Sequence, residues 1–314
     1  MRVLGLRGSY GVASVIGAAL TLTAWGIGEA CANVRACQEL EHRYEQIKAG
    51  ASTAELNATL YSAADRGCEA LAERLLEAGA SLEARDRLGA SALSRAAAAG
   101  QTEVVALFLA RGAPVDARNL EGSTALYRAA ENGRLKVMQE LIEGGAKVDL
   151  PGRSGITPLA AAAYMGNQAA VELLIEKGAE LNSIDATKKS PIVYAAGRGF
   201  PGIVKLLLDS GVDVNARYGN DLSALMWAAG YSSEAGVEDA VKVMALLLDR
   251  GANIDAQDNR GRSALMIAAE LNHEKAVDLL IARGADKTLK DKQGKRARDL
   301  TTLTALREKL AAAQ

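Results

Sequence analysis

The sequence predicts an all-α solenoid of repeated helix–turn–helix units joined by short β-turn fingers. One observation is an apolar tetrapeptide that begins at residues 58, 91, 124, 157, 190, 223 and 263, so that five intervals are 33 residues and the last is 40. A second is a pair of glycine series in the same register, starting at Gly67 and Gly79. Aromatic residues make up only 4% of a chain that is 49% hydrophobic, which suits a thin core of small helices. A fixed period of this length is typical of repeat architectures, in which each unit packs only on its neighbours.

The third unit shows why each repeat should form two helices. A hydroxyl group at position 123 or 124 can cap the first helix by accepting a backbone N–H, and Leu126 begins an i, i+3, i+4 stripe of apolar residues. Gly133 then ends this helix in a left-handed conformation, and Gly145 ends a second apolar helix. In two units Pro158 or Pro191 follows the capping residue, where the missing N–H of proline costs nothing.

This pattern resembles the ankyrin repeat, which has a period of about 33 residues and the signature T-P-L-H-x-A-A. The segment 157–159 matches that signature most closely, and the tail 211–216 is similar to the family's G-A-D-V-N-A motif. The resemblance covers about residues 51–314 and implies a concave face, formed by turn tips and first helices, through which such proteins bind partners. Apolar packing must replace the hydrogen bonds of the family's histidine, because its place is held by Ser94, Tyr127, Ala160, Val193, Met226 and Met266.

We expect four segments along the chain. These are a signal peptide at 1–32, an N-terminal capping helix at 33–57, seven ankyrin-type repeats at 58–290 and a C-terminal capping half-repeat at 291–314. Capping segments are expected because the end units of a repeat array need a polar outer face.

The N-terminal segment has the pattern of an export signal. Between Arg7 and Glu29 lie 21 uncharged residues, and 30–32 match the small-x-small pattern of a signal-peptidase site. An uncleaved anchor is the alternative, since 21 residues can just span a bilayer; a lipoprotein signal through Cys31 fits less well. We expect a periplasmic or secreted protein whose mature part is not inserted in a membrane.

The cysteine count predicts one disulfide. Removing residues 1–32 leaves only Cys37 and Cys68, an even number in an oxidising compartment. The bond would join the capping helix to the second helix of the first unit. The alternative is that both are small, unpaired core residues.

The residues that carry chemistry do not assemble into a catalytic or metal-binding set. His42 and His273, the two histidines, lie far apart in a solenoid, and the glycines mark helix ends rather than phosphate-binding loops. A balance of 37 basic against 38 acidic residues gives no general electrostatic footprint for nucleic acid. We therefore expect a monomer that is not an enzyme, uses no cofactor or metal and binds a protein rather than nucleic acid.

A helical wheel of the first helices, at about 100° per residue, predicts where that partner binds. With Leu225 turned toward the core, Trp227 and Tyr231 point away from it. The place of Trp227 holds Arg95 and Arg128 in early units and Tyr194 and Ile267 in later ones. The place of Tyr231 holds Met165 and Leu271 in two other units. Such an apolar patch usually marks an interface, although packing in the grooves between units is the alternative. The predicted partner-binding residues are Ile156, Tyr164, Met165, Tyr194, Trp227, Tyr231 and Ile267.

The sixth unit carries seven extra residues within 230–239, the difference between its 40-residue interval and the usual 33. Two interpretations stand: an insertion tolerated on an exposed edge, and a contact loop or weak cation site. The second would use Tyr231, Ser232, Ser233, Glu234 and Asp239.

At the level of function, the leading hypothesis is a protein-binding module outside the cytoplasm. The alternatives are a structural scaffold of the periplasm and a secreted, host-directed effector.

Overall fold

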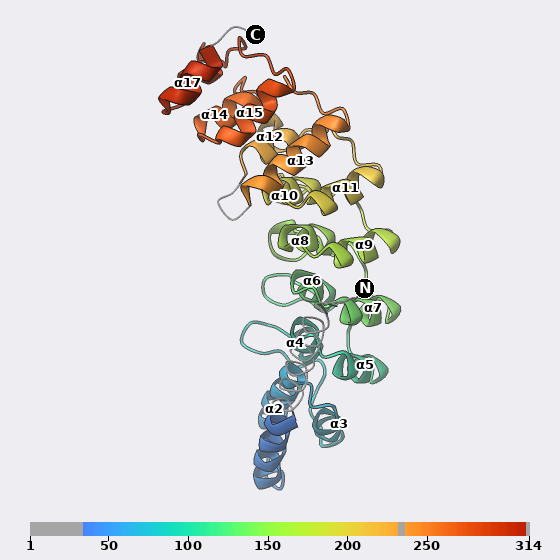
Figure 1. Ribbon diagram of the computed structural model, residues 1–314. Coiled ribbons are helices and arrows are strands. Elements are labelled where there is room, and N and C mark those ends of the chain that lie inside the picture. Colours follow the sequence, from blue (N-terminus) through green and yellow to red (C-terminus); the bar gives the residue numbers. More distant parts are fainter. Residues whose placement is uncertain (1–33, 232–235, 312–314) are drawn as a thin grey trace, which may run out of the picture.

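The computed structural model describes residues 34–231 and 236–311 and confirms the all-α solenoid. Within these ranges the regular structure is helical, apart from one isolated antiparallel bridge between Tyr218 and Leu222. The helices stand in two columns along a curved stack (Figure 1). Also within the described ranges, no helix is both long and apolar enough to cross a membrane.

The first column consists of the first helix of each unit, called here the inner helices, which pack on one another in chain order. They are α2 (Thr53–Arg66), α4 (Ala92–Ala99), α6 (Ala125–Glu131), α8 (Pro158–Met165), α10 (Pro191–Gly197), α12 (Ala224–Ala229) and α14 (Ala264–Glu270). The second column consists of the outer helices. They are α3 (Glu69–Glu77), α5 (Thr102–Ala110), α7 (Leu135–Glu143), α9 (Gln168–Glu176), α11 (Pro201–Asp209), α13 (Val237–Asp249) and α15 (Glu274–Ala282).

Two 3-10 turns, two short C-terminal helices and the N-terminal capping helix described below complete the described structure. The turns are η1 (Arg153–Gly155) and η2 (Gly219–Asp221), and the C-terminal helices are α16 (Ala297–Leu300) and α17 (Thr304–Ala311). We use "finger" for the connection that leads from each outer helix to the next inner helix. The seventh and last finger leads from α15 to α16.

Hydroxyl caps and left-handed ends fix the inner helices, as the sequence predicts. Thr124 Oγ1 accepts the N–H of Tyr127 at 3.2 Å, and Gly100 ends α4 with φ 88°. Asn272 takes the equivalent left-handed place in the last unit, with φ 58°. The side chains that stand in place of the family's histidine are all buried, so packing does replace its hydrogen bonds: Ser94, Tyr127, Ala160, Val193, Met226 and Met266.

The N-terminal end differs from the expected boundary. The capping helix covers 34–47, and a capping box starts α2 at Thr53: Ser52 Oγ accepts the N–H of Glu55 at 3.3 Å, and Glu55 Oε2 accepts the N–H of Ser52 at 2.8 Å. Residues 53–57 therefore belong to the first unit. The predicted signal peptide, 1–32, lies outside the described residues.

A disulfide joins Cys37 of the capping helix to Cys68, the residue before α3. The two Cα atoms are 5.4 Å apart, and the bond closes a separation of 31 residues. The capping helix also buries Leu40 and Tyr44 against the first unit. Covalent and apolar contacts thus hold the same end of the stack.

The insertion of the sixth unit extends an outer helix. Helix α13 has 13 residues where α11 has 9, and the extra residues lie at its N-terminal end. Asp239 in that extension pairs with Lys242 at 2.7 Å. Ser232, Ser233 and Glu234, three residues of the proposed contact loop, lie outside the described part of the chain.

Candidate partner-binding face

Each of five fingers is organised by one carboxylate or amide side chain. In the fourth finger, Asp185 Oδ1 accepts the backbone N–H of Thr187 at 2.7 Å and of Lys189 at 3.1 Å. The same pair of bonds, to the residues two and four positions later, is made by Asp86, Asn119, Asp258 and Asp291. Because these bonds fix both sides of the turn, each finger is a rigid projection rather than a loose loop.

Neighbouring fingers are also bonded to one another through the backbone. The N–H of Leu120 donates to the carbonyl of Leu88 at 3.0 Å, and the N–H of Lys292 donates to that of Arg260 at 2.9 Å. Similar bonds join the third finger to the fourth, the fourth to the fifth and the fifth to the sixth. These bonds connect the first finger to the second, and the third to the seventh in sequence, beside the inner helices.

Two inner helices hold their fingers through the second carboxylate oxygen. Arg95 Nη1 donates to Asp86 Oδ2 at 2.7 Å, and the Tyr194 hydroxyl donates to Asp185 Oδ2. Burial raises the pKa of Tyr194, and its hydrogen bond to Asp185 raises it further. Burial alone would raise the pKa of Asp185 as well, but the hydrogen bonds that its carboxylate accepts outweigh burial and hold that pKa below its usual value. Arg95 and Tyr194 stand at the same place in their helices, so this place anchors a finger.

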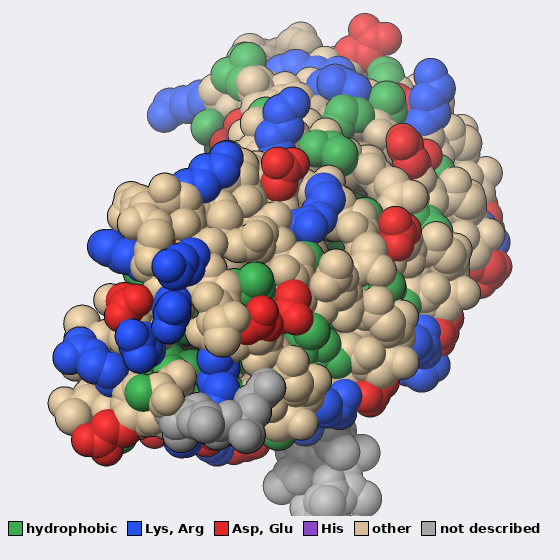
Figure 2. All heavy atoms as spheres, turned by 90° about the horizontal axis from the view of Figure 1, so that it is seen from above, with side chains coloured by type: hydrophobic (Ala, Val, Ile, Leu, Met, Phe, Trp, Pro, Cys, Tyr) green, Lys and Arg blue, Asp and Glu red, His purple; other side chains and the backbone are tan. Residues whose placement is uncertain are grey.

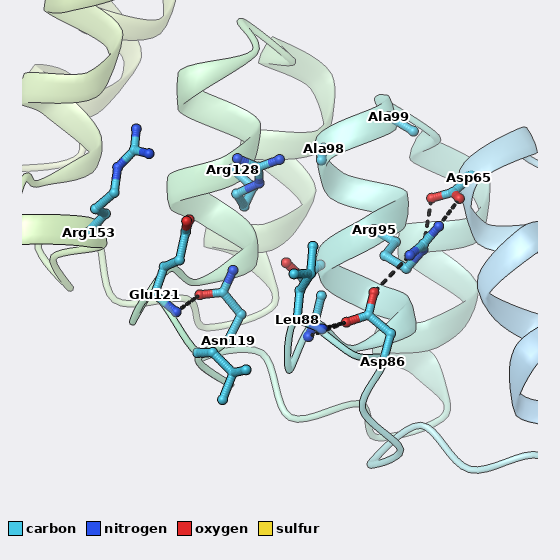
Figure 3. A pocket seen from close by; sticks show the side chains of 13 residues that line it. Asp65, Asp86, Leu88, Arg95, Ala98, Ala99, Asn119, Glu121, Arg128 and Arg153 are labelled. Atoms are coloured by element: carbon cyan, nitrogen blue, oxygen red, sulfur yellow. Dashed lines mark hydrogen bonds and ion pairs between the residues drawn. The ribbon is translucent and has the colours of Figure 1, made fainter. Parts of the chain in front are cut away.

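We call the first half of the inner face the polar half because charged side chains gather there, beside two exposed finger leucines, Leu88 and Leu120. A groove of ≈ 630 Å³ lies between the first two fingers and α4 (Figure 3). In it the Arg95 guanidinium lies between two carboxylates, with Nε 3.1 Å from Asp65 Oδ1 and Nη1 2.7 Å from Asp86 Oδ2. Near the opposite wall, Arg128 and Arg153 approach Glu131 at 2.5 Å and 3.9 Å. Most of the charged groups that line this groove are thus paired within the protein.

The second half of the inner face is apolar and aromatic. Tyr164 and Met165 are 41% and 47% exposed, and the Tyr164 ring meets the Tyr194 ring edge-on with centroids 5.5 Å apart. Lys189 Nζ lies 5.5 Å from the centroid of Tyr194 and 5.2 Å from that of Trp227, so it links the two rings. We name this surface the apolar row and define it as Tyr164, Met165, Tyr194, Trp227, Tyr231 and Leu271.

One predicted site residue is corrected by its burial. Ile267 is 7% exposed, and its Cγ2 would lie 3.2 Å from a Cβ at Gly230, so its side chain fills the space that the glycine leaves open. Trp227 is also partly buried. Its ring lies over Gly197 of the preceding unit, where a Cβ would be 3.8 Å from the ring. Leu271, which is 48% exposed, holds the outward place in the last unit.

The other predicted residues lie in two settings. Tyr231 is partly buried and stacks on His273, with ring centroids 3.9 Å apart. Ile156 is partly buried on the third finger, where its carbonyl accepts the N–H of Gly152 at 2.8 Å. Tyr231 therefore lies just after α12 and packs against His273, whereas Ile156 belongs to a finger.

The sequence interpretation missed the polar residues that surround the aromatic rings. Arg198 lies 4.4 Å from the centroid of Tyr164, and Lys189 and Asp185 organise the surroundings of Tyr194. A signal for the finger carboxylates was present, since Asp or Asn stands five residues before the helix-capping residue at positions 86, 119, 185, 258 and 291. A search for periodic polar residues, in addition to apolar ones, would have found it.

A metal site needs several histidine, cysteine or carboxylate side chains close together. Within the described residues, no group of three or more is arranged to hold a metal ion. His273 Nδ1 lies 2.9 Å from the carbonyl oxygen of Ala229, and His42 Nε2 lies 3.0 Å from Gln46 Nε2. Each imidazole thus lies within hydrogen-bonding distance of another polar group of the same chain.

The repeated units, the fingers and the inner face define a repeat solenoid of the kind that serves as a binding scaffold. A family model described as ankyrin repeats (3 copies) matches residues 60–152, 147–218 and 192–291, and the chain belongs to the ankyrin-repeat family. Ankyrin repeats are generally protein–protein interaction modules.

One similar solved structure is the human ASB11 ankyrin repeat domain. The two chains superpose with a TM-score of 0.64 and 27% sequence identity, over 70% of this chain and 96% of that one. No curated protein sequence matches the chain.

Proposed function

We propose that this protein is a non-catalytic protein-binding module that acts outside the cytoplasm and holds its partner against the apolar row. The observation that carries the proposal is the exposure of Tyr164, Met165 and Leu271 on one face of the stack, at 41%, 47% and 48%. Large apolar side chains exposed together on a soluble repeat usually mark an interface. The family supports the general function, because ankyrin repeats generally bind proteins.

The composition of the row suits a rigid binding surface. Tyrosine and tryptophan give large contact areas with few rotatable bonds, so their ordering on binding costs little entropy. The edge-on contact of Tyr164 with Tyr194, and the bond that ties Tyr194 to Asp185, already hold these rings before a partner arrives. A uniformly polar face would instead favour the alternative of a periplasmic scaffold without a discrete ligand.

The proposed location rests on the N-terminal pattern and on the disulfide. A bond between Cys37 and Cys68 would not persist in most reducing compartments, and it fits an exported protein. Cell fractionation with N-terminal sequencing tests this: we expect a chain that begins near Asn33 outside the cytoplasm. A cytosolic protein that still begins at Met1 contradicts export, and delivery into a host cell would distinguish an effector from a resident periplasmic protein.

The binding face can be tested with surface residues that contribute little to the core. The intact mature chain is used to capture partners from the exported fraction, beside a Tyr164→Ser/Leu271→Ser variant. Leu120→Ser is the matched control, because Leu120 is 79% exposed on a finger of the polar half. We expect one protein to be retained by the wild type and the control and lost with the double variant. Equal retention by all three contradicts the proposed face.

A further inference from the structure

The charges of this nearly neutral chain are segregated in the fold. The seven outer helices hold five basic and fourteen acidic residues. The fingers carry the opposite excess, which is concentrated at the last one: residues 286–298 include six basic and two acidic side chains. Viewed from the α17 end, Lys and Arg side chains gather toward one side of the molecule (Figure 2). A net charge of -1 therefore hides a strong local excess of positive charge.

The basic side chains of the last two fingers form one patch. We name it the basic patch and define it as Arg260, Lys290, Lys292 and Lys295, all of which are exposed. The two fingers are joined by the bond from the N–H of Lys292 to the carbonyl of Arg260, at 2.9 Å, and by a bond from Gln257 Nε2 to the carbonyl of Lys290, at 3.1 Å. In the part of the chain that the structure describes, none of the four cationic groups forms an ion pair.

All four carboxylates of these fingers accept backbone N–H groups: Asp255, Asp258, Asp286 and Asp291. Asp291 Oδ1 accepts the N–H groups of Gln293 and Lys295 at 2.9 Å and 2.8 Å. Asp258 is 5% exposed and is bound both by its finger and by the Arg262 guanidinium, at 2.9 Å. The acidic groups thus bind the backbone of the turns, while the four cationic side chains of the basic patch are exposed.

The basic patch and the apolar row are parts of the same side of the molecule. Arg262 Nη1 reaches from the sixth finger to Glu270 Oε2, at 2.7 Å, at the end of α14 where Leu271 follows. On the fourth finger, Lys189 already lies 5.2 Å from the ring centroid of Trp227. Cationic side chains of the fourth and sixth fingers, Lys189 and Arg262, therefore lie next to the apolar row, and Arg260 of the basic patch belongs to the same sixth finger.

We propose that the basic patch receives an acidic segment of the protein partner, so that the partner presents apolar side chains flanked by carboxylates. This inference rests on the proposed protein-binding function. Ammonium and guanidinium groups without an ion pair gain most from a carboxylate partner, and such complementarity sets specificity and association rate.

The distribution of charge favours a short acidic segment over a broad polyanion. The first two fingers, 78–91 and 111–124, each carry two basic and two acidic residues, and the fifth, 210–223, carries one basic and two acidic. The third, fourth and sixth fingers, 144–157, 177–190 and 250–263, each carry one net positive charge, and the seventh, 283–296, carries four. A nucleic acid or an anionic bilayer that extended over all the fingers would therefore gain mainly at the seventh. Salt screening limits the attraction between exposed charges to a range of about 10 Å. A segment of a few acidic residues therefore matches the size of the patch best.

The test uses a defined probe on the oxidised mature chain. A fluorescein-labelled twelve-residue peptide with a central Leu-Trp-Leu flanked by glutamates is compared with one flanked by lysines, by fluorescence anisotropy. We expect the glutamate peptide alone to bind at low salt and to bind more weakly as salt rises. The Lys290→Glu/Lys292→Glu/Lys295→Glu variant should weaken its binding by about tenfold or more.

The matched control reverses the same number of charges on the first two fingers. Arg85→Glu/Arg87→Glu/Arg118→Glu changes the net charge equally, and all three side chains are exposed, so we expect it to leave peptide affinity within about twofold. The inference is overturned by an equal effect of both variants or by no binding of the glutamate peptide. It is also overturned if phosphatidylglycerol vesicles or a 20-base-pair DNA duplex bind the patch more tightly than the peptide.

The two proposals can fail separately. If the lysine variant retains the natural partner while Tyr164→Ser/Leu271→Ser loses it, the apolar binding face stands and the acidic-segment inference is wrong. If both variants retain it, the proposed binding face is itself contradicted.

Discussion

Replacing Asp185 with alanine tests the structural basis of the fingers. The Asp185 side chain accepts the backbone N–H groups of Thr187 and Lys189, the Thr187 hydroxyl at 2.7 Å, and the Tyr194 hydroxyl. It is 5% exposed, so water cannot easily replace the carboxylate. The substitution leaves four donor groups without their partner, and one of them, the Tyr194 hydroxyl, holds a ring of the apolar row in place.

The magnitude follows from those bonds. A hydrogen bond to a charged group contributes about 1.5–3 kcal/mol, and a buried donor left without a partner costs about 1–3 kcal/mol. Burial of the carboxylate offsets part of this, and neighbouring bonds are not additive. We therefore expect Asp185→Ala to lower the free energy of unfolding by about 2–4 kcal/mol.

The chain provides its own control for the role of the charge. Asn119 makes the equivalent two backbone bonds in the second finger, at 3.0 Å and 2.8 Å, with a neutral amide. Asp185→Asn should therefore keep the turn and weaken chiefly the bond from Tyr194, at a cost of about 1 kcal/mol. Urea unfolding followed by circular dichroism measures both variants. A loss of less than about 0.5 kcal/mol in Asp185→Ala, or equal losses in both, refutes the reasoning.

Three further predictions concern stability. Cys37→Ser should lower the free energy of unfolding by about 3–4 kcal/mol, the chain-entropy value for the 31-residue separation to Cys68, and two titratable thiols in the non-reduced mature protein would contradict the bond. Gly152→Ala should cost about 1–3 kcal/mol in urea unfolding, because the new Cβ would lie 2.7 Å from the ring of Tyr127; an unchanged midpoint contradicts this. Burial would raise the pKa of Asp86, but hydrogen bonds from Arg95 and from backbone N–H groups outweigh it and lower that pKa. The contribution of Asp86 to the free energy of unfolding is therefore present above about pH 4 and is lost as pH falls through the lowered pKa. An Asp86→Asn variant with the same acid-unfolding midpoint as the wild type contradicts this.

The repeat itself could be predicted because its signal is local and recurs. Hydroxyl caps such as Thr124 and helix-ending glycines such as Gly100 act within a few residues, and the same local rules apply in every unit. The α2 boundary could not be read from the period alone. The first unit begins earlier because Ser52 and Glu55 form a capping box ahead of the repeated tetrapeptide.

The details of the inner face depend on contacts between units, which a helical wheel does not contain. The wheel turns Ile267 outward, but Gly230 of the preceding unit opens a space that buries it. It also treats Tyr194 as a free aromatic residue, although its hydroxyl binds a carboxylate nine positions earlier on a finger. Such pairings require knowing which finger lies beside which helix.

The distribution of charge was hidden for a similar reason. The chain total of -1 is the sum of acidic outer helices and basic fingers, which alternate along the sequence and separate only in space. A count made separately for each predicted element would have revealed it. Whether an individual lysine such as Lys292 pairs with a carboxylate depends on how the finger folds.

The most direct test of the proposed binding face is the affinity of the captured partner for Tyr164→Ala, measured by titration calorimetry beside the melting temperature of the same variant. Tyr164 suits this test better than Trp227, whose partial burial mixes packing with binding. We predict a loss of about 2 kcal/mol in binding free energy and a melting temperature within about 2 °C of the wild type. Unchanged affinity, with or without a lower melting temperature, would contradict the assignment of the apolar row as the partner-binding face.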